Sequence, residues 1–477
     1  MLKKIYKLGE LTLMKNYIEK ERKNHPLVDL FWECTLSCNA KCKHCGSSAE
    51  NKKYDGELTT KEIKSVFKQI SNDMDASKIL INVTGGEPLV RQDLCEVMQY
   101  ATCELGFHWG MTTNGILLND ENIEKLKKAN METISISIDG LRETHDRFRG
   151  VPGSYDIITE NIKKLRAANF VKHIQVTTVF HKENINQLEE LYEIMQGLNL
   201  DSWRLVSIDP IGRAKENDTL LLNGQEIKKI LDFIKLKNKK GKLELSYGCP
   251  AFLGLDYEKE VRRQYFFCRT GINVASILYN GDLFVCPNVP RRKEFIQGNI
   301  RTDNFKEVWE NKYQIFRNPE RTKSEECGNC KYWEYCSGGA FHTWNFNENV
   351  QNKCTYNMMN IGEWSAMKKV LSKITKLFSS IGLALFTFGT KVMARDFDKI
   401  VPLYGIEPVE PKKPTFLEKS LPIIKGVFIP LILIIGLIIY WRKSKSDKGA
   451  KILLIICIVI FVLIIYGAFY FFDAIKN

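Results

Sequence analysis

Residues 38–45 read Cys38-Asn39-Ala40-Lys41-Cys42-Lys43-His44-Cys45 and follow the apolar run Leu30-Phe31-Trp32. Three cysteines spaced C-x3-C-x2-C in one loop suit the corner of an iron–sulfur cube, because short offsets let the backbone curl and aim three sulfurs at three irons. The fourth iron then has no protein ligand and is open to a small molecule that binds through nitrogen and oxygen. A structural zinc loop or a buried cysteine cluster is the alternative interpretation.

A glycine motif follows the cysteine loop. Residues 84–88, Thr-Gly-Gly-Glu-Pro, close a predicted strand at 78–84. The two glycines let backbone groups approach a ligand closely, and Glu87 supplies a fixed carboxylate. A bare turn is the alternative, but the position at the end of a strand behind a three-cysteine loop favours a ligand site.

Predicted strands and helices alternate from Asp29 to about Leu236. Thr59 and Glu62 form a capping box that begins the helix after the first strand. Alternation of this kind predicts an α/β fold with a parallel sheet, and parallel barrels place their chemistry at the carboxyl ends of the strands. The predicted strands are 29–34, 78–84, 107–113, 132–138, 173–179 and 202–207.

Together these motifs resemble the radical S-adenosylmethionine (SAM) superfamily. The resemblance implies a partial (βα)6 TIM-like barrel, with a [4Fe-4S] cluster on Cys38, Cys42 and Cys45 that binds SAM at its unique iron. It also implies that the motif at Gly85, Gly86 and Glu87 holds the SAM amino group, and that His44 replaces an aromatic residue near the adenine. Positions that touch the SAM ribose and carboxylate in the family match Asn114, Ser137 and Arg149. A helix cap is the alternative role for Asn114, and a surface salt bridge is the alternative role for Arg149.

A second group of cysteines follows the predicted barrel. Cys268 precedes Gly281 by an interval of twelve residues, Cys286 comes after four more, and Cys327-x2-Cys330-x5-Cys336 and Cys354 follow. This pattern resembles the SPASM extension of radical SAM enzymes, which carries auxiliary iron–sulfur clusters. The resemblance implies one auxiliary cluster on Cys327, Cys330, Cys336 and Cys354, and another on Cys268 and Cys286, with Cys249 as a third ligand. Ala340 stands where the family has a further cysteine, and a zinc ribbon is the alternative for the whole group.

Composition limits the class of protein. The chain has 477 residues, of which 44% are hydrophobic and 26% are charged, so it exceeds one domain and can fill a sizeable core. Fourteen cysteines, many at short spacings and without a secretory leader, favour metal clusters in a reducing compartment. The net charge of +13 is spread along the chain without a basic–aromatic motif, so we expect no nucleic-acid partner and attribute the charge to membrane attraction.

The carboxyl-terminal quarter contains two apolar runs, at 421–441 and 452–472, and each is long enough to cross a bilayer. They predict transmembrane helices, with a buried helix as the alternative, and an integral membrane protein whose catalytic domain is cytoplasmic. A shorter apolar segment, 377–390, is read as an interfacial amphipathic helix. The predicted domains are a basic amino-terminal helix at 1–28, a barrel at 29–240, a SPASM-like domain at 241–360, an amphipathic segment and proline-rich linker at 361–420, and the two spans.

The resemblance implies an enzyme that reductively cleaves SAM to a 5′-deoxyadenosyl radical, which abstracts a hydrogen atom from a peptide or small protein. An electron donor such as flavodoxin or ferredoxin is the expected redox partner. A sulfatase maturase that forms formylglycine is one alternative, but such enzymes place an Asp after the cysteine that matches Cys286, and this chain has Pro287. A non-catalytic iron–sulfur electron carrier is the other, and the intact cysteine and glycine motifs count against it.

Overall fold

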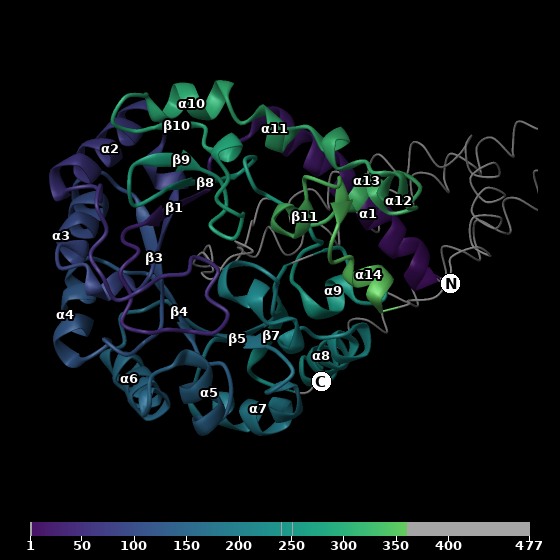
Figure 1. Cartoon of the computed structure of the whole chain (residues 1–477), viewed down its shortest axis with the longest axis horizontal. Helices are drawn as coiled ribbons and strands as arrows, with labels where there is room; N and C mark the ends of the chain where they lie inside the picture. Colours follow the sequence, from purple (N-terminus) through teal and green to yellow (C-terminus); the bar gives the residue numbers. More distant parts are fainter. Residues whose placement is uncertain (1, 240, 250, 360–477) are drawn as a thin grey trace, which may run out of the picture. The chain divides into compact units, whose positions relative to one another are not determined.

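The computed structural model describes residues 2–239, 241–249 and 251–359 (Figure 1). Its centre is a ten-stranded sheet in the order β10-β9-β8-β1-β2-β3-β4-β5-β6-β7. Neighbouring strands from β1 to β7 are parallel, and β8 is parallel to β1, whereas β8, β9 and β10 pair antiparallel. The strands are β1 Asp29–Glu33, β2 Leu80–Thr84, β3 His108–Thr113, β4 Thr133–Ser137, β5 His173–Phe180, β6 Ser202–Ser207, β7 Glu244–Tyr247, β8 Val274–Ile277, β9 Asp282–Phe284 and β10 Gly298–Asn299.

All six predicted strands are present as β1 to β6, which confirms the α/β barrel-like fold. The sheet also extends beyond the predicted end of the barrel at residue 240, because β7 pairs with β6. β7 has only four residues, of which Leu245 and Tyr247 are buried, so its alternating pattern is too short to mark a strand in the sequence. The predicted domain limits stay a prediction.

Helices cover the outer face of the curved sheet, as Figure 1 shows for α2 to α8. The strands are buried on both faces, as expected of a parallel sheet, and Trp32, Trp109 and Trp203 fill the core between strands and helices. The predicted capping box at Thr59 and Glu62 is present at the start of α2. The helices are α2 Thr60–Asp73, α3 Leu94–Gln99, α4 Asp120–Lys128, α5 Arg142–Arg149, α6 Ser154–Ala168, α7 Leu188–Gly197 and α8 Gly224–Lys237.

The amino-terminal helix α1 (Leu2–Asn24) packs on the cysteine-rich segment that follows the barrel. Leu11, Met14 and Ile18 form its buried stripe and contact the apolar cluster that contains Phe252 and Ala340. The cysteine-rich segment itself consists of short elements: α9 Glu258–Val261, α10 Phe305–Asn311, α11 Gln314–Arg317, α12 Glu325–Gly328, α13 Trp333–Cys336, α14 Thr355–Met358, the short 3-10 helices η8 Pro319–Thr322 and η9 Phe341–Thr343, and the pair β11 Trp344–Asn345 and β12 Val350–Gln351.

The predicted integral membrane location is corrected by this structure. In the part of the chain that the structure describes, no helix combines the length and the apolar composition needed to cross a bilayer. The runs at 421–441 and 452–472, on which the prediction depended, lie outside the described residues, as does the segment 361–420. The membrane assignment is therefore not retained.

Candidate functional site

The three-cysteine loop leaves the carboxyl end of β1 and is held by backbone bonds from three sides. Gly86 and Glu87 donate their N–H groups to the carbonyls of Thr35 (2.7 Å) and Ser37 (2.9 Å), at the start of the loop. Lys41 and Lys43 donate to carbonyls at the end of α5, at 3.1 and 3.0 Å. The loop is therefore fixed by β2, α5 and its own strand rather than by its side chains alone.

The three cysteines of this loop are gathered in one small cluster. Cys38 and Cys42 are buried and Cys45 is half-buried beside them. Burial raises the pKa of the Cys38 thiol to about 11 and also raises the pKa of Cys42, where the nearby Arg149 opposes the shift. Thiolates at these positions therefore need positive compensation, which the irons of a cluster provide.

Two glycines let the end of β2 lie against the cysteine loop. A Cβ on Gly85 would overlap the Thr35 carbonyl oxygen, and one on Gly86 would overlap the Ser37 carbonyl oxygen. Gly85 also has φ +149°, which side chains rarely adopt. Only glycine at both positions permits this approach, so the motif positions the loop as well as lining it.

Glu87 and Asn114 connect β2 and β3 to the loop. The Glu87 carboxylate is fully buried and accepts hydrogen bonds from the Thr113 hydroxyl (2.7 Å), the Asn114 N–H (2.7 Å) and the Leu89 N–H (3.2 Å). Asn114 donates its side-chain N–H to Asn39 of the loop at 2.7 Å. Both side chains thus have internal partners, and their predicted contacts with SAM stay predictions.

Arg149 lies beside the cysteines with only 11% of its side chain exposed, in contrast to the surface salt bridge considered as its alternative. Its Nη2 lies 2.6 Å from Asp139 Oδ2, and its Nη1 donates to Cys42 Sγ at 3.6 Å. Asp139 follows β4 and is fully buried. Ser137 ends β4 and is half-buried. The structure therefore brings Arg149 to the cluster loop, and its role toward SAM stays a prediction.

His44 takes part in a stack of rings. It lies 4.8 Å from Phe148, nearly parallel to it, and Phe148 lies 3.8 Å from His181, which follows β5. His44 Nε2 is 3.6 Å from Asp139 Oδ2. The stack fixes the imidazole at the edge of the cluster loop, where the sequence predicts an adenine contact.

Arg213 is a residue of this site for which the sequence predicts no role. Its Nε donates to the Cys42 carbonyl at 2.7 Å and its Nη1 to the Ala49 carbonyl at 2.9 Å, so one side chain spans the loop. A Cβ on the preceding Gly212 would overlap the Cys45 carbonyl oxygen. The loop carbonyl that Arg213 binds lies 171 residues away in the sequence, so no local pattern could indicate this contact.

A cavity of about 190 Å³ lies at the carboxyl ends of β5 and β6. His44 and Gly46 of the cluster loop form one wall, Arg204 and Asp209 another, and Cys249 and His342 of the cysteine-rich segment complete it. The cavity is therefore bounded by both the barrel and the cysteine-rich segment, and it reaches the cluster loop.

Asp209 joins the barrel to the cysteine-rich segment at this cavity. Its Oδ1 accepts from Lys353 Nζ at 2.6 Å, and its Oδ2 lies 3.2 Å from His342 Nε2. Lys353 also donates to Ser207 Oγ (3.0 Å) and to the Ile208 carbonyl (2.6 Å). Burial opposes ionisation of Asp209, but Lys353 and His342 lower its pKa to about 2, so it remains a carboxylate. The sequence carried no signal for this network, because its members are up to 146 residues apart.

The four cysteines predicted for one auxiliary cluster, Cys327, Cys330, Cys336 and Cys354, all lie in the cysteine-rich segment, and their assignment to one cluster stays a prediction. Burial first, and then the charges of neighbouring cysteines including Cys327 and Cys330, together raise the pKa of Cys336 to about 12 and that of Cys354 to about 11. Among the described residues, no three His, Cys, Asp or Glu side chains are close enough together to hold one metal ion. The thiolates of a cubane cluster bind separate irons, so they need not meet at one point.

The cysteines predicted for the other auxiliary cluster are more widely distributed. Cys249 belongs to the apolar cluster under α1, Cys286 is fully buried in the main core, and Cys268 packs against both. Cys268 Sγ accepts the Phe341 N–H at 3.4 Å. Ala340, where the family has a cysteine, is buried beside Cys249 in the cluster under α1. The assignment of these three cysteines to one cluster stays a prediction.

Comparison with known proteins agrees with this geometry. Residues 32–195 match the radical SAM superfamily, and residues 268–331 match SPASM, an iron–sulfur cluster-binding domain. An AdoMet-dependent heme synthase from Methanosarcina barkeri is 30% identical over 324 residues, which are 64% of this chain and 89% of that protein. The chain belongs to the radical SAM superfamily. Mycofactocin maturase MftC of Mycobacterium tuberculosis is 29% identical over 320 residues, covering 66% of this chain and 78% of the maturase.

Solved structures share the fold of this radical SAM enzyme. The enzyme anSMEcpe with bound AdoMet and a Cp18Cys peptide superposes with a TM-score of 0.57 at 18% identity, covering 73% of this chain and 99% of that one. Streptococcus suis SuiB bound to S-adenosylmethionine gives a TM-score of 0.56 at 19% identity, covering 69% and 77% of the two chains. The cofactors of this radical SAM enzyme are a SAM-binding [4Fe-4S] cluster, SAM and auxiliary iron–sulfur clusters, so the zinc alternatives are not retained.

The residues present fit these groups. The cysteine loop offers three thiols on a backbone fixed from three sides, and the two glycines let the end of β2 approach this loop so closely that a Cβ at either position would overlap a loop carbonyl oxygen. When bound, the cluster and SAM supply a radical able to abstract a hydrogen atom from carbon. The protein itself fixes the cysteine loop through Arg213, places a cation beside Cys42 through Arg149, and bounds the adjacent cavity with the cysteine-rich segment.

Two buried histidines near the cluster loop predict a loss of stability in mild acid. Burial lowers the pKa of His145 and of His181 to about 4, so each imidazole is neutral in the folded enzyme, whereas the unfolded chain binds a proton near pH 6.5. The contribution of each neutral imidazole to the free energy of unfolding is complete above pH 6.5. It is lost as the pH falls toward 4, at about 1.4 kcal/mol per pH unit for each histidine. Anaerobic urea unfolding at pH 7.5, 6.5 and 5.5 measures it, and His145→Gln is expected to flatten the pH dependence. Equal slopes for this variant and the parent enzyme would contradict the prediction.

Proposed function

We propose that this enzyme modifies a peptide or a small protein, one side chain of which enters the cavity between the cluster loop and the cysteine-rich segment. The size of the cavity carries the proposal. Its 190 Å³ suits a single amino-acid side chain, whereas sites for larger ligands range from about 300 to 1,000 Å³. The 29% identity to a protein named mycofactocin maturase supports the same class.

The residues that line this cavity have distinct roles in the proposal. Asp209 holds His342 at 3.2 Å, so the imidazole faces the cavity in a fixed orientation. Cys249 also lines the cavity, and His44 brings the cluster loop to its wall. In the proposal, His342 hydrogen-bonds a polar group of the entering residue while the SAM-binding loop faces the carbon atom to be attacked. The predicted cysteine, glycine, Asn114, Ser137 and Arg149 assignments belong to this proposal.

A second candidate substrate class is a tetrapyrrole. Its support is that the relative of 30% identity is named a heme synthase, and that a protein named Fe-coproporphyrin III synthase is 25% identical over 352 residues. The limited cavity volume favours the peptide. Sulfatase maturation remains disfavoured because Pro287 occupies the position where those enzymes place an Asp.

The test uses the reconstituted, reduced enzyme with SAM. Peptides encoded beside this gene and Fe-coproporphyrin III are incubated separately, and mass spectrometry follows each of them together with 5′-deoxyadenosine. A mass change in a peptide, with the tetrapyrrole unchanged, is the expected result. His342→Gln is expected to reduce peptide modification more than substrate-free SAM cleavage. Modification of the tetrapyrrole with all peptides unchanged would overturn the proposal.

A further inference from the structure

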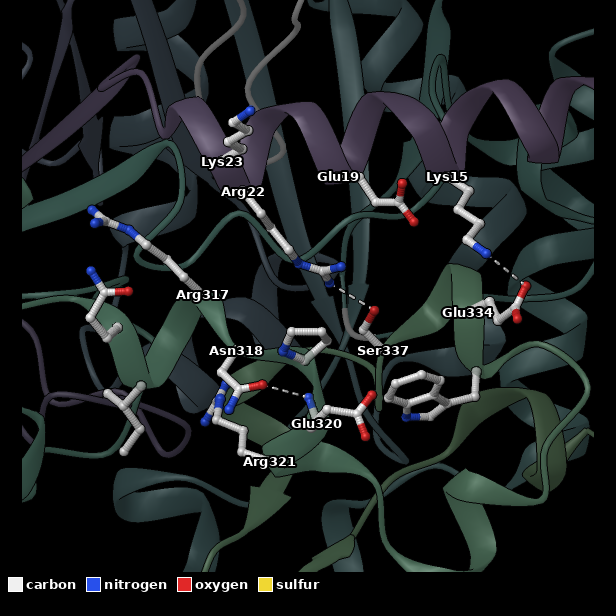
Figure 2. A pocket seen from close by; sticks show the side chains of 14 residues that line it. Lys15, Glu19, Arg22, Lys23, Arg317, Asn318, Glu320, Arg321, Glu334 and Ser337 are labelled. Atoms are coloured by element: carbon white, nitrogen blue, oxygen red, sulfur yellow. Dashed lines mark hydrogen bonds and ion pairs between the residues drawn. The ribbon is translucent and has the colours of Figure 1, made fainter.

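Two arginines from distant parts of the chain meet beside Cys268. Arg22 comes from α1 and Arg321 from η8, and both line a groove of about 900 Å³ between α1, α11 and α13. Figure 2 shows Arg22 reaching from α1 toward Ser337, with Arg321 across the groove near Asn318. Behind the groove, the same two arginines border a chamber of about 30 Å³ together with Cys268, Cys336 and Phe341. The pair therefore borders both the groove and the chamber that the two cysteines line.

These guanidinium groups have no carboxylate partner among the ion pairs of the described residues. Arg22 Nη2 donates to the neutral Ser337 hydroxyl at 2.8 Å. Arg321 lies over the Phe341 ring, 3.8 Å from its centroid, and its Nε and Nη1 are buried without a hydrogen-bond acceptor. Charge that is buried without a partner is costly, so an anion or a strong acceptor is expected near these atoms.

Arg317 in the same groove shows the contrast. Its guanidinium donates to the carbonyls of Gly271 (2.9 Å), Glu310 (3.2 Å) and Trp309 (2.6 Å), so its N–H groups are satisfied within the fold. A structural arginine in this segment thus finds protein acceptors. Arg321, four residues later, does not find them at Nε and Nη1.

Cys268 lines the small chamber that both arginines border. The Cys268 charge acts on Arg22 and on Arg321, in each case opposing the effect of burial on the pKa of the arginine. Cys268 Sγ also accepts the Phe341 N–H, which belongs to the residue after Ala340. Because Arg321 Nε and Nη1 are closed to solvent, a molecule docked in the open groove cannot accept from them.

We propose that Arg22 and Arg321 form a cationic shell around the auxiliary iron–sulfur cluster bound through Cys268, with the free N–H groups of Arg321 donating to its sulfur. The proposal rests on the predicted role of Cys268 as a cluster ligand. Positive charge and N–H donors around cluster sulfurs stabilise the reduced state and raise the reduction potential. In this arrangement α1 supplies one of the two cations, Arg22, to the surroundings of the cluster.

The experiment is a redox titration of the holoenzyme followed by electron paramagnetic resonance, which requires no substrate. Cys268→Ser first identifies the signal of the cluster in question. Arg321→Gln is expected to make the potential of that signal more negative by at least a tenfold change in its reduction equilibrium, which is 59 mV for one electron. Arg22→Gln is expected to shift it in the same direction, and Arg321→Lys is expected to recover part of the shift.

Lys23→Gln is the matched control. It removes a positive charge from the same helix and the same groove, but Lys23 is exposed and does not border the Cys268 chamber, so the potential is expected to stay unchanged. An unchanged potential in Arg321→Gln, or equal shifts in Arg321→Gln and Lys23→Gln, would overturn the inference. If Arg321→Gln loses the cluster, its retention in Arg321→Lys supports the cationic role, and its loss there as well overturns it.

The experiments distinguish a failure of the Cys268 ligand assignment from a failure of the proposed peptide substrate. If Cys268→Ser leaves every cluster signal in place, the ligand assignment and the inference fall together, whereas the proposed peptide substrate is unaffected. If the peptide proposal fails, the titration still reports on the arginines, because it measures the enzyme without substrate.

Discussion

Cys42→Ala is expected to reduce the formation of 5′-deoxyadenosine from SAM to background. Cys42 is the middle thiol of the loop at 38–45, and its carbonyl is held by Arg213 at 2.7 Å. Its loss leaves two protein ligands for a cluster that needs three, and it leaves Arg149 Nη1 without the Sγ acceptor at 3.6 Å. The purified variant is expected to contain about four fewer irons per chain, because the auxiliary cysteines are untouched.

Iron and sulfide analysis with a liquid-chromatography assay of 5′-deoxyadenosine measures both effects. Cys103→Ala is the matched control, because Cys103 is an exposed cysteine outside every predicted ligand set. It is expected to keep the iron content and the SAM cleavage of the parent enzyme. A Cys42→Ala variant with full iron content and full cleavage would refute the assignment of the loop.

The sequence allowed much of the barrel to be predicted, because its signals are local. Six strands were found from runs of β-branched and aromatic residues, and the capping box at Thr59 and Glu62 was found from its spacing. The short strands β7 to β10 were not found, because two to four residues carry no measurable period. The pairing of β7 with β6 and of β8 with β1 depends on tertiary contacts.

Short motifs of the candidate site can be recognised in the sequence, whereas contacts between distant segments cannot. The cysteine loop and the glycine motif were visible as patterns, and the structure places them in backbone contact. The link between Asp209, His342 and Lys353 was not visible, because it joins the end of β6 to the cysteine-rich segment. The membrane location was predicted from hydropathy alone, and the described residues contain no helix that supports it.

Cys354→Ala is expected to remove the auxiliary cluster predicted on Cys327, Cys330, Cys336 and Cys354, and to destabilise the cysteine-rich segment strongly. The binding free energy of a structural metal centre is folding free energy when the site does not exist in the unfolded chain. The variant is expected to lose about four irons and to unfold at a lower urea concentration. Substrate-free cleavage of SAM is expected to continue, because the loop at 38–45 is held by the barrel. Retention of full iron content would contradict the ligand set.

Lys353→Met tests whether iron loss in Cys354→Ala comes from loss of the Cys354 thiolate or from disturbance of the adjacent Lys353. Lys353 is buried and donates to Ser207, Ile208 and Asp209 at 3.0, 2.6 and 2.6 Å, so methionine keeps the side-chain volume but leaves the Asp209 carboxylate without its cation. Breaking a buried ion pair in this way costs about 3–5 kcal/mol. We therefore expect Lys353→Met to lower the free energy of unfolding while keeping the auxiliary iron that Cys354→Ala loses. Equal iron loss in the two variants would mean that the contact between Lys353 and the barrel is also needed to retain the cluster, and that iron loss in Cys354→Ala does not by itself identify Cys354 as a ligand.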